Sequence, residues 1–138
     1  MNNDWKIRNR LQVAAITRHG AEEGTVTLVG PRQVPFVAYF YRCNFEVGQT
    51  YVIEFEAILY PLEWEVIFSE NRDQRCEIVP QGDFCACLAY GKIISIHPVV
   101  VDFGDIVMEL GEWTNDPDVI GAYVYFCFDQ LHITQICD

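Results

Sequence analysis

Short runs of alternating hydrophobic and polar residues cover most of the chain. The runs are rich in Val, Ile, Tyr and Phe, and Gly, Pro, Asn or Asp separates them at intervals of about ten residues. This pattern predicts β-strands, because side chains alternate between two faces of an extended chain. The expected strands are Leu11–Arg18, Thr25–Val29, Val34–Arg42, Tyr51–Leu59, Glu63–Ser69, Phe84–Ala89, Lys92–His97, Val99–Asp102, Ile106–Leu110, Tyr123–Phe128 and Leu131–Gln135.

Helix should be scarce, because no long window keeps the 3.6-residue period. Short helical segments are expected only around Asp116–Ile120 and within the first ten residues. Many short strands with turn glycines predict an all-β fold, a small barrel or sandwich of short antiparallel strands. The pattern is similar to that of the oligonucleotide/oligosaccharide-binding (OB) barrel. At 138 residues, the chain is expected to form one domain over residues 1–138.

Two segments of the chain share a sequence pattern. Phe45–Phe55 and Asp118–Phe128 both place an acid and Val or Ile before a glycine, and both continue as a run of Tyr, Val and Phe. We expect each glycine, Gly48 and Gly121, to form a turn that starts a barrel strand. The spacing of 73 residues suggests a pseudo-repeat of a β unit, over about 11–59 and 92–135.

The charge of the chain is strongly asymmetric. The net charge is −11, and residues 1–76 hold 10 acids and 8 bases, whereas residues 77–138 hold 10 acids and one base, Lys92. A negative field repels phosphate backbones and anionic lipids, so direct nucleic-acid and membrane binding are not expected. A basic protein surface is the partner that such a field attracts. The alternative is that the acids only keep a hydrophobic chain soluble.

The N-terminal sequence and the cysteines both point to a cytoplasmic protein. The sequence MNNDWKIRNRLQ lacks the apolar core of a signal peptide, and no run approaches the length of a membrane span. In a reducing compartment the six cysteines are interpreted as buried hydrophobes or free thiols. Cys85 and Cys87, with Cys76 upstream, could begin a zinc site, but the second pair of ligands is missing. No metal and no cofactor are therefore expected.

The sequence EFEAILYPLEWEV holds two pairs of glutamates on either side of Pro61. On a strand, Glu54 and Glu56 share one face, and Glu63 and Glu65 share one face. The proline should introduce a bend or an edge, or the chain could fold back there as a hairpin. The stretch is interpreted as a solvated edge or as an acidic edge that binds a partner. A divalent metal site and a catalytic carboxylate pair are two weaker hypotheses for the same residues.

Candidate catalytic groups are scattered. His19, His97 and His132 are far apart in sequence, and none belongs to a known catalytic motif, although a His/Cys or His/Asp pair in space stays open. The segment Asp102–Asp105 contains the triplet DFG, which is interpreted as a hairpin turn because no other kinase motif accompanies it. The chain is therefore expected not to be an enzyme.

The segment 112–118 combines a tryptophan with three acids. Trp113 provides a large contact area in a polar loop, as interface hot spots do. The surrounding Glu112, Asp116 and Asp118 would attract a basic partner. The alternative is that Trp113 folds back onto the core and Asp116 caps a short helical turn.

Together these features predict a non-enzymatic acidic binding protein. It would neutralise or occupy a basic protein partner such as a toxin or nuclease, as an immunity protein or an anti-defence inhibitor does. The predicted contacts are Glu112, Trp113, Asp116 and Asp118, with Glu54, Glu56, Glu63 and Glu65 as a second patch. The main alternative is a small barrel that binds a sugar, nucleotide or peptide in an aromatic-lined pocket, with Tyr39, Tyr41, Trp64 and Tyr125 as candidates. An enzyme, or a structural subunit of a larger assembly, would also be compatible with the sequence.

Overall fold

The chain folds mainly as β-strands. A computed structural model describes residues 9–58, 62–81 and 85–136. Its strands are β1 (Arg10–Arg18), β2 (Glu23–Val29), β3 (Pro35–Tyr41), β4 (Thr50–Ile58), β5 (Glu77–Pro80), β6 (Cys87–Ile96), β7 (Val99–Asp102), β8 (Val107–Glu109), β9 (Tyr123–Phe128) and β10 (Gln130–Ile136). Its helices are α1 (Trp64–Ser69) and the 3-10 helix η2 (Pro117–Val119). The predicted all-β fold class is confirmed.

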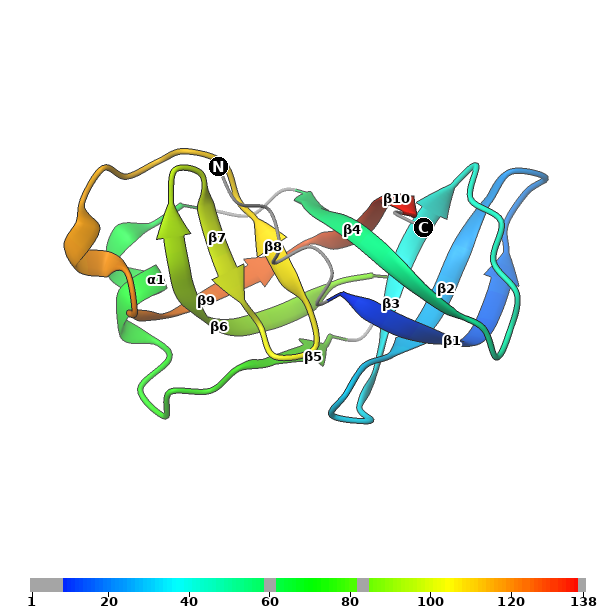
Figure 1. Cartoon of the computed structure of the whole chain (residues 1–138), viewed down its shortest axis with the longest axis horizontal. Helices are drawn as coiled ribbons and strands as arrows, with labels where there is room; N and C mark the ends of the chain where they lie inside the picture. Colours follow the sequence, from blue (N-terminus) through cyan, green and yellow to red (C-terminus); the bar gives the residue numbers. More distant parts are fainter. Residues whose placement is uncertain (1–8, 59–61, 82–84, 137–138) are drawn as a thin grey trace.

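Five strands close into a barrel, seen at the right of Figure 1. Their order is β1-β2-β3-β10-β4, and β4 pairs with β1 to complete the circle. All neighbours are antiparallel except β3 and β10, which are parallel. Strands β2 and β3 alternate buried and more exposed residues throughout, so their inward side chains fill the barrel.

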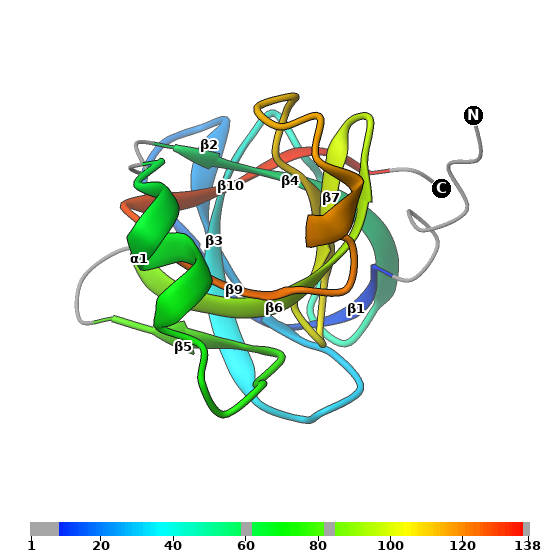
Figure 2. The same cartoon turned by 90° about the vertical axis from the view of Figure 1, so that its left-hand side faces the viewer.

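A second antiparallel sheet follows the barrel, at the left of Figure 1. The long strand β6 is its centre and pairs with β9 along one edge. On the other edge β6 pairs with β5 near its start and with β7 near its end, and β8 pairs with β7. Only Asp129 separates β9 from β10, so the chain passes directly from the second sheet into the barrel. The end-on view in Figure 2 shows the strands of both parts as one ring.

Most predicted strands are confirmed, and the differences have local causes. The predicted strands Phe84–Ala89 and Lys92–His97 form one strand, β6, although Phe84 itself lies outside the described residues. Gly91 is therefore not a turn; a β-carbon there would lie 2.6 Å from the carbonyl oxygen of Asp102, so glycine permits the close approach of β7. Strand β5 was not predicted, because it is four residues long and ends in a proline.

The predicted turns lie where the sequence pattern placed them. Gly48 and Gly121 have φ angles of 92° and 94°, and each precedes a strand by two residues. Gly48 precedes the barrel strand β4 as expected, whereas Gly121 precedes β9 of the second sheet, so the expected barrel strand is wrong there. Between β7 and β8, the backbone N–H of Gly104 donates to the Asp102 carboxylate at 2.9 Å, which confirms the predicted hairpin turn. The single domain and the pseudo-repeat stay predictions.

Buried hydrophobic side chains form one cluster that includes residues of both parts. Phe36 and Phe55 pack in the barrel with ring centroids 6.2 Å apart, and Phe126 and Phe128 stack at 5.8 Å in the second sheet. Polar contacts join the same parts. The buried Asn9, just before β1, bonds to the backbone of Val107 in β8 through its side-chain nitrogen at 2.8 Å and its oxygen at 2.6 Å.

Candidate functional site

The segment after the barrel strand β4 is a helix, so the predicted strand Glu63–Ser69 is wrong. Residues 64–69 form α1, whose buried side chain is Ile67. Trp64 and Phe68 are one turn apart, with ring centroids at 4.6 Å, a spacing that fits a helix and not a strand. Glu63 occupies the N-cap position and Glu65 the first turn, so the expectation that both share one strand face is also wrong. The expected bend at Pro61 lies outside the described residues.

An aromatic cluster joins α1 to the segment before η2. The ring of Trp113 contacts Trp64, Phe68 and Phe126, with centroid separations of 6.1, 6.4 and 6.4 Å. Trp113 is half-buried, whereas Trp64 is 48% exposed. Trp113 therefore packs back against the core, and Trp64 is the more accessible tryptophan.

The acidic segment that follows Trp113 is ordered by short local contacts. The Asp116 carboxylate accepts a hydrogen bond from the backbone N–H of Asp118 at 2.9 Å and so caps η2. Buried Val119 fixes the helix against the core, while Asp116 and Asp118 are exposed. Glu112 is also exposed and lies 3.6 Å from Nδ1 of His97. The structure thus presents three carboxylates to solvent from one loop.

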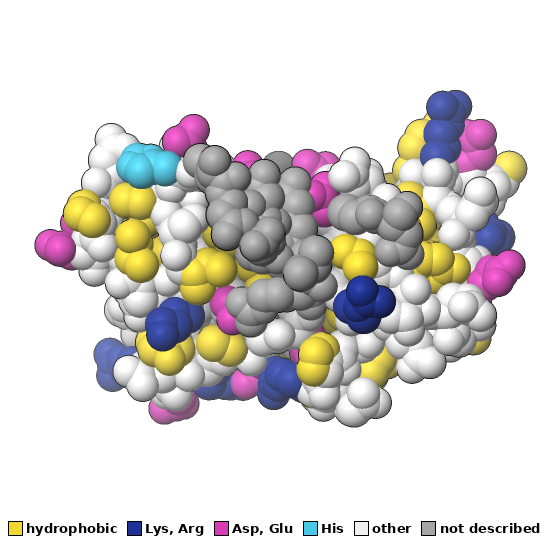
Figure 3. Space-filling model, in the orientation of Figure 1, with side chains coloured by type: hydrophobic (Ala, Val, Ile, Leu, Met, Phe, Trp, Pro, Cys, Tyr) yellow, Lys and Arg dark blue, Asp and Glu magenta, His cyan; other side chains and the backbone are white. Residues whose placement is uncertain are grey.

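The structure brings most of the predicted contact residues to one end of the molecule. Helix α1 and the η2 loop both lie at the left end of the molecule in Figure 1, and in Figure 2 they face the viewer from either side of the ring of strands. We call this end the acidic end; it comprises Glu63, Trp64, Glu65, Glu112, Trp113, Asp116 and Asp118. On the face shown in Figure 3, hydrophobic side chains gather at the left end with acidic ones at its margin, and the Lys and Arg side chains of that end lie below them.

Glu54 and Glu56 do not belong to the acidic end. Both lie on β4 in the barrel, where Glu56 is exposed and Glu54 is half-buried. Glu56 is the register partner of His132 on β10, and His132 in turn is the partner of Tyr39 on β3. The predicted second patch is therefore divided, with one pair of glutamates on the barrel and one pair on α1.

A small apolar pocket lies between α1 and β9. It has a volume of about 180 Å³ and is lined by Glu63, Val66, Ile67, Tyr125, Phe126 and Cys127. Burial raises the pKa of Tyr125, so its hydroxyl stays protonated at neutral pH. Val66 and the exposed Leu62 were not predicted to be functional, because both belong to a region that was predicted as a strand and its preceding turn. The i, i+3, i+4 spacing of Trp64, Ile67 and Phe68 was the signal that could have revealed them.

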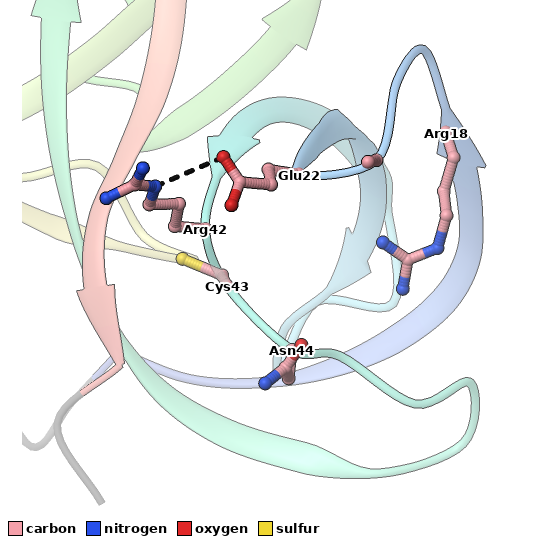
Figure 4. A pocket seen from close by; sticks show the side chains of 6 residues that line it. Arg18, Glu22, Arg42, Cys43 and Asn44 are labelled. Atoms are coloured by element: carbon pink, nitrogen blue, oxygen red, sulfur yellow. Dashed lines mark hydrogen bonds and ion pairs between the residues drawn. The ribbon is translucent and has the colours of Figure 1, made fainter.

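A second, polar pocket opens at the free end of the barrel, opposite the acidic end. It has a volume of about 350 Å³ and lies between the β1–β2 loop and the end of β3, as Figure 4 shows. Its lining residues are Arg18, Ala21, Glu22, Arg42, Cys43 and Asn44. We call it the barrel mouth. None of its residues was predicted to be functional.

The aromatic residues proposed for a ligand pocket do not meet in one place. Tyr39 and Tyr41 lie on β3, Trp64 on α1 and Tyr125 on β9. Tyr39 instead contacts His132, with ring centroids 4.8 Å apart and the rings tilted by 43°, and its hydroxyl donates to Glu23 at 2.5 Å. The hydrogen bond to Glu23 raises the pKa of Tyr39.

The three histidines, all within the described residues, lie in separate parts of the fold. Cys85 and Cys87 are buried, and burial raises their pKa values to about 11 and about 12, so both are protonated thiols at neutral pH. His19 lies beyond β1, His97 lies beside Glu112, and His132 bonds to Gln130 at 2.7 Å. Within the three described ranges, no three His, Cys, Asp or Glu side chains are grouped as a metal ion requires.

Comparisons add no relative to this picture. No protein-family model matches the chain, and no curated protein or solved structure is significantly similar to it. Among the residues that the structure describes, no helix has the length and apolar character needed to cross a membrane.

Proposed function

We propose that the protein is a non-enzymatic binding protein whose acidic end occupies the basic surface of a protein partner. The observation that carries the proposal is the meeting of two separate acidic segments beside the exposed side chain of Trp64. Glu63 and Glu65 come from α1, and Glu112, Asp116 and Asp118 come from a loop about fifty residues later, yet Trp64 and Trp113 bring the two segments into contact at 6.1 Å. Folding thereby concentrates carboxylates that the sequence keeps apart.

The acidic end has the composition of a binding surface. Trp64 and Leu62 are 48% and 51% exposed, and tryptophan is one of the side chains that supply most of the affinity of an interface. The carboxylates around them supply steering, because a negative surface speeds the encounter with a positive one. The aromatic centre would therefore hold the partner, and the acidic margin would select it.

The pocket between α1 and β9 is suited to a single basic side chain of the partner. Its volume of about 180 Å³ is below that of a typical small-molecule site but sufficient for one long side chain. The aliphatic stem of a lysine or arginine would lie against Val66 and Phe126, and its charged head would lie near Glu63. Apolar walls with one carboxylate at the opening favour this occupant over an acidic or a purely apolar one.

The partner class that we propose is a toxin or nuclease with a basic cleft, which the protein would neutralise in the cytoplasm. An acidic surface opposite such a cleft occupies the place of the polyanion that the cleft normally binds. The same field opposes direct binding of nucleic acid to this end. An immunity protein or an anti-defence inhibitor would have this design.

A site-specific photo-cross-link tests the proposal. A benzoylphenylalanine at Val66, beside the pocket, should capture a protein with a basic surface in the cell that encodes the chain. The same group at the exposed Thr134 on β10 is the control and should not capture that protein. Capture of one protein from both positions, or of no basic protein from Val66, would contradict the proposal.

We also propose that the barrel is OB-like, and a small ligand on its outer surface is the second candidate function. Support comes from the five-stranded closure and from the contact between the rings of Tyr39 and His132, since OB barrels bind sugars and nucleotides over strands 2 and 3. Isothermal titration with oligosaccharides and oligonucleotides, repeated with Tyr39→Ala, is the test. Binding that survives this substitution would place the ligand elsewhere.

A further inference from the structure

The barrel mouth is a built cavity formed by three segments. The end of β1 contributes Arg18, the β1–β2 loop contributes Ala21 and Glu22, and the chain after β3 contributes residues 42–44. Backbone hydrogen bonds hold these segments together, since the N–H of His19 donates to the carbonyl of Glu23 at 3.0 Å and the N–H of Arg42 to that of Glu22 at 2.6 Å. The cavity is therefore fixed by the fold of the hairpin and not by side chains alone.

Arg18 presents a guanidinium group to this cavity. Its Cζ atom lies 5.8 Å from the ring centroid of the buried Phe40, a cation–π contact that positions the group at the opening. Figure 4 shows the guanidinium directed inward, toward the side where Asn44 lies. Among the described residues no carboxylate lies within 4.0 Å of Arg18, in contrast to Arg75, which is paired with Glu77. An oriented arginine of this kind is a ready donor to an anion.

Arg42 provides a second guanidinium group, which is paired with the carboxylate of Glu22 in the same cavity. Its Nε atom lies 3.2 Å from Oε2 of Glu22, and its Cζ atom lies 5.3 Å from the ring centroid of Tyr41. The residue has a φ of 57°, a left-handed conformation that is uncommon for a side chain larger than glycine. Strained backbone of this type concentrates at ligand sites. Glu22 thus already forms an ion pair with Arg42, one of the two arginines that an anion would contact.

We infer that the barrel mouth binds a small anionic ligand that carries a phosphate or carboxylate group. Arg18 and the side-chain amide of Asn44 would donate to the anion, and Arg42 would add a second guanidinium when it leaves Glu22. The volume of about 350 Å³ falls in the range of small-molecule sites. This inference does not depend on the proposed partner, because the barrel mouth and the acidic end lie at opposite ends of the molecule (Figure 1).

Local charge makes the barrel mouth the suitable place for an anion on an acidic protein. The described segment 9–58 holds four arginines and five glutamates, whereas the whole chain has a net charge of −11. Two arginines and one glutamate line the mouth, so the cavity itself carries a net charge of +1. Glu22 would compete with a bound anion for Arg42, so removing the Glu22 carboxylate should strengthen binding.

The test is an NMR titration of the full chain with two probes, pyrophosphate and citrate. Saturable shifts of the backbone amides of residues 18–22 and 42–44 are expected with at least one of them, and which probe binds distinguishes a phosphate from a carboxylate ligand. The Arg18→Gln variant should weaken binding by about tenfold, the effect of losing one charge-assisted hydrogen bond. The control Arg10→Gln removes the same charge from the exposed start of β1 and should leave the affinity within about twofold.

Two further variants keep the inference falsifiable if Arg18→Gln does not fold. Asn44→Asp should abolish binding, because it replaces an amide donor with a carboxylate. Glu22→Gln should tighten binding by several-fold, because it frees Arg42. An absence of saturable shifts with both probes would overturn the inference, and so would equal losses in Arg18→Gln and Arg10→Gln, which would indicate non-specific attraction. Unchanged or weaker binding in Glu22→Gln would overturn the role of Arg42.

Discussion

Replacing Asn9 with alanine should lower the free energy of unfolding by about 2–4 kcal/mol. The Asn9 side chain is fully buried and makes two hydrogen bonds to one residue, at 2.8 Å to the carbonyl of Val107 and at 2.6 Å from its N–H. In addition, the carbonyl of Asn9 accepts from the N–H of Ile53 in β4 at 3.0 Å. A single residue thus joins the start of the barrel to the second sheet.

The magnitude follows from what the substitution leaves behind. Alanine lacks the side-chain amide of Asn9, so the N–H and the carbonyl of the buried Val107 both lose their hydrogen-bond partners. Each unpaired buried group costs about 1–3 kcal/mol, and entry of water into the vacated space favours the lower half of the summed range. Urea unfolding followed by far-UV circular dichroism, with equal slopes for both proteins, measures the difference.

The control for this substitution is Gln12→Ala. Gln12 lies three residues later and also bonds to a backbone carbonyl, that of Gly48 at 3.3 Å, but the bond is exposed. Its loss should cost less than about 0.5 kcal/mol. A change below about 1 kcal/mol for Asn9→Ala, the lower limit for one unpaired buried group, would refute the reasoning. Two separate unfolding transitions in the natural sequence would contradict the single domain over residues 1–138.

Three more predictions follow from burial and close contacts. Iodoacetamide at neutral pH should modify the exposed Cys127 before Cys85 and Cys87, since burial raises the pKa of Cys85 to about 11 and of Cys87 to about 12. Peptide mass mapping over time gives the order of modification, and early labelling of Cys87 would contradict it. The free energy of unfolding should fall as the pH drops below 6.5, because burial lowers the pKa of His132 against the opposing effect of Glu56. The unfolded chain then takes up a proton that the folded chain does not. In urea titrations, His132→Gln should remove a pH dependence of at most about 1.4 kcal/mol per pH unit. Gly24→Ala should cost about 1–3 kcal/mol by thermal unfolding, since its β-carbon would lie 2.2 Å from the carbonyl oxygen of Thr17, and a neutral effect would show that β1 and β2 can separate.

Several strands could be predicted because buried and more exposed residues alternate along them. In β2 and β3 every second residue is buried, so the pattern of period two is present in the sequence itself. The closure of the barrel could not be predicted in the same way. It depends on the pairing of β10 with β3 and β4, and no local pattern specifies which distant strands will meet.

The errors lie where local patterns have two interpretations. The stretch that forms α1 contains Trp, Val, Ile and Phe, which favour strands, and the six-residue helix is too short to show a sustained period. Its packing against β9 decides the outcome, because Ile67 becomes buried there. Gly91 was interpreted as punctuation between strands, whereas its role is to admit the backbone of β7.

The candidate sites were predictable in composition but not in arrangement. The sequence indicates that Glu112, Asp116 and Asp118 are accessible, because a loop with Asn, Asp and Pro cannot form a regular strand. The contact between Trp64 and Trp113 that unites them with α1 is a tertiary contact over 49 residues. The barrel mouth was missed because Arg18 and Arg42 are isolated in the sequence, and only the fold places the ends of β1 and β3 at the same end of the barrel.

The most direct test of the proposed function is the association rate of the partner captured at Val66, measured by stopped flow at several ionic strengths. Glu63→Gln with Glu65→Gln should slow association by a factor of about three to ten at low salt, a part of what electrostatic steering supplies. Glu46→Gln with Glu109→Gln removes two exposed charges outside the acidic end and is the matched control. We predict a loss confined to the first pair that disappears at high salt. Equal rates for both pairs, or rates that do not depend on salt, would contradict a function for the acidic end.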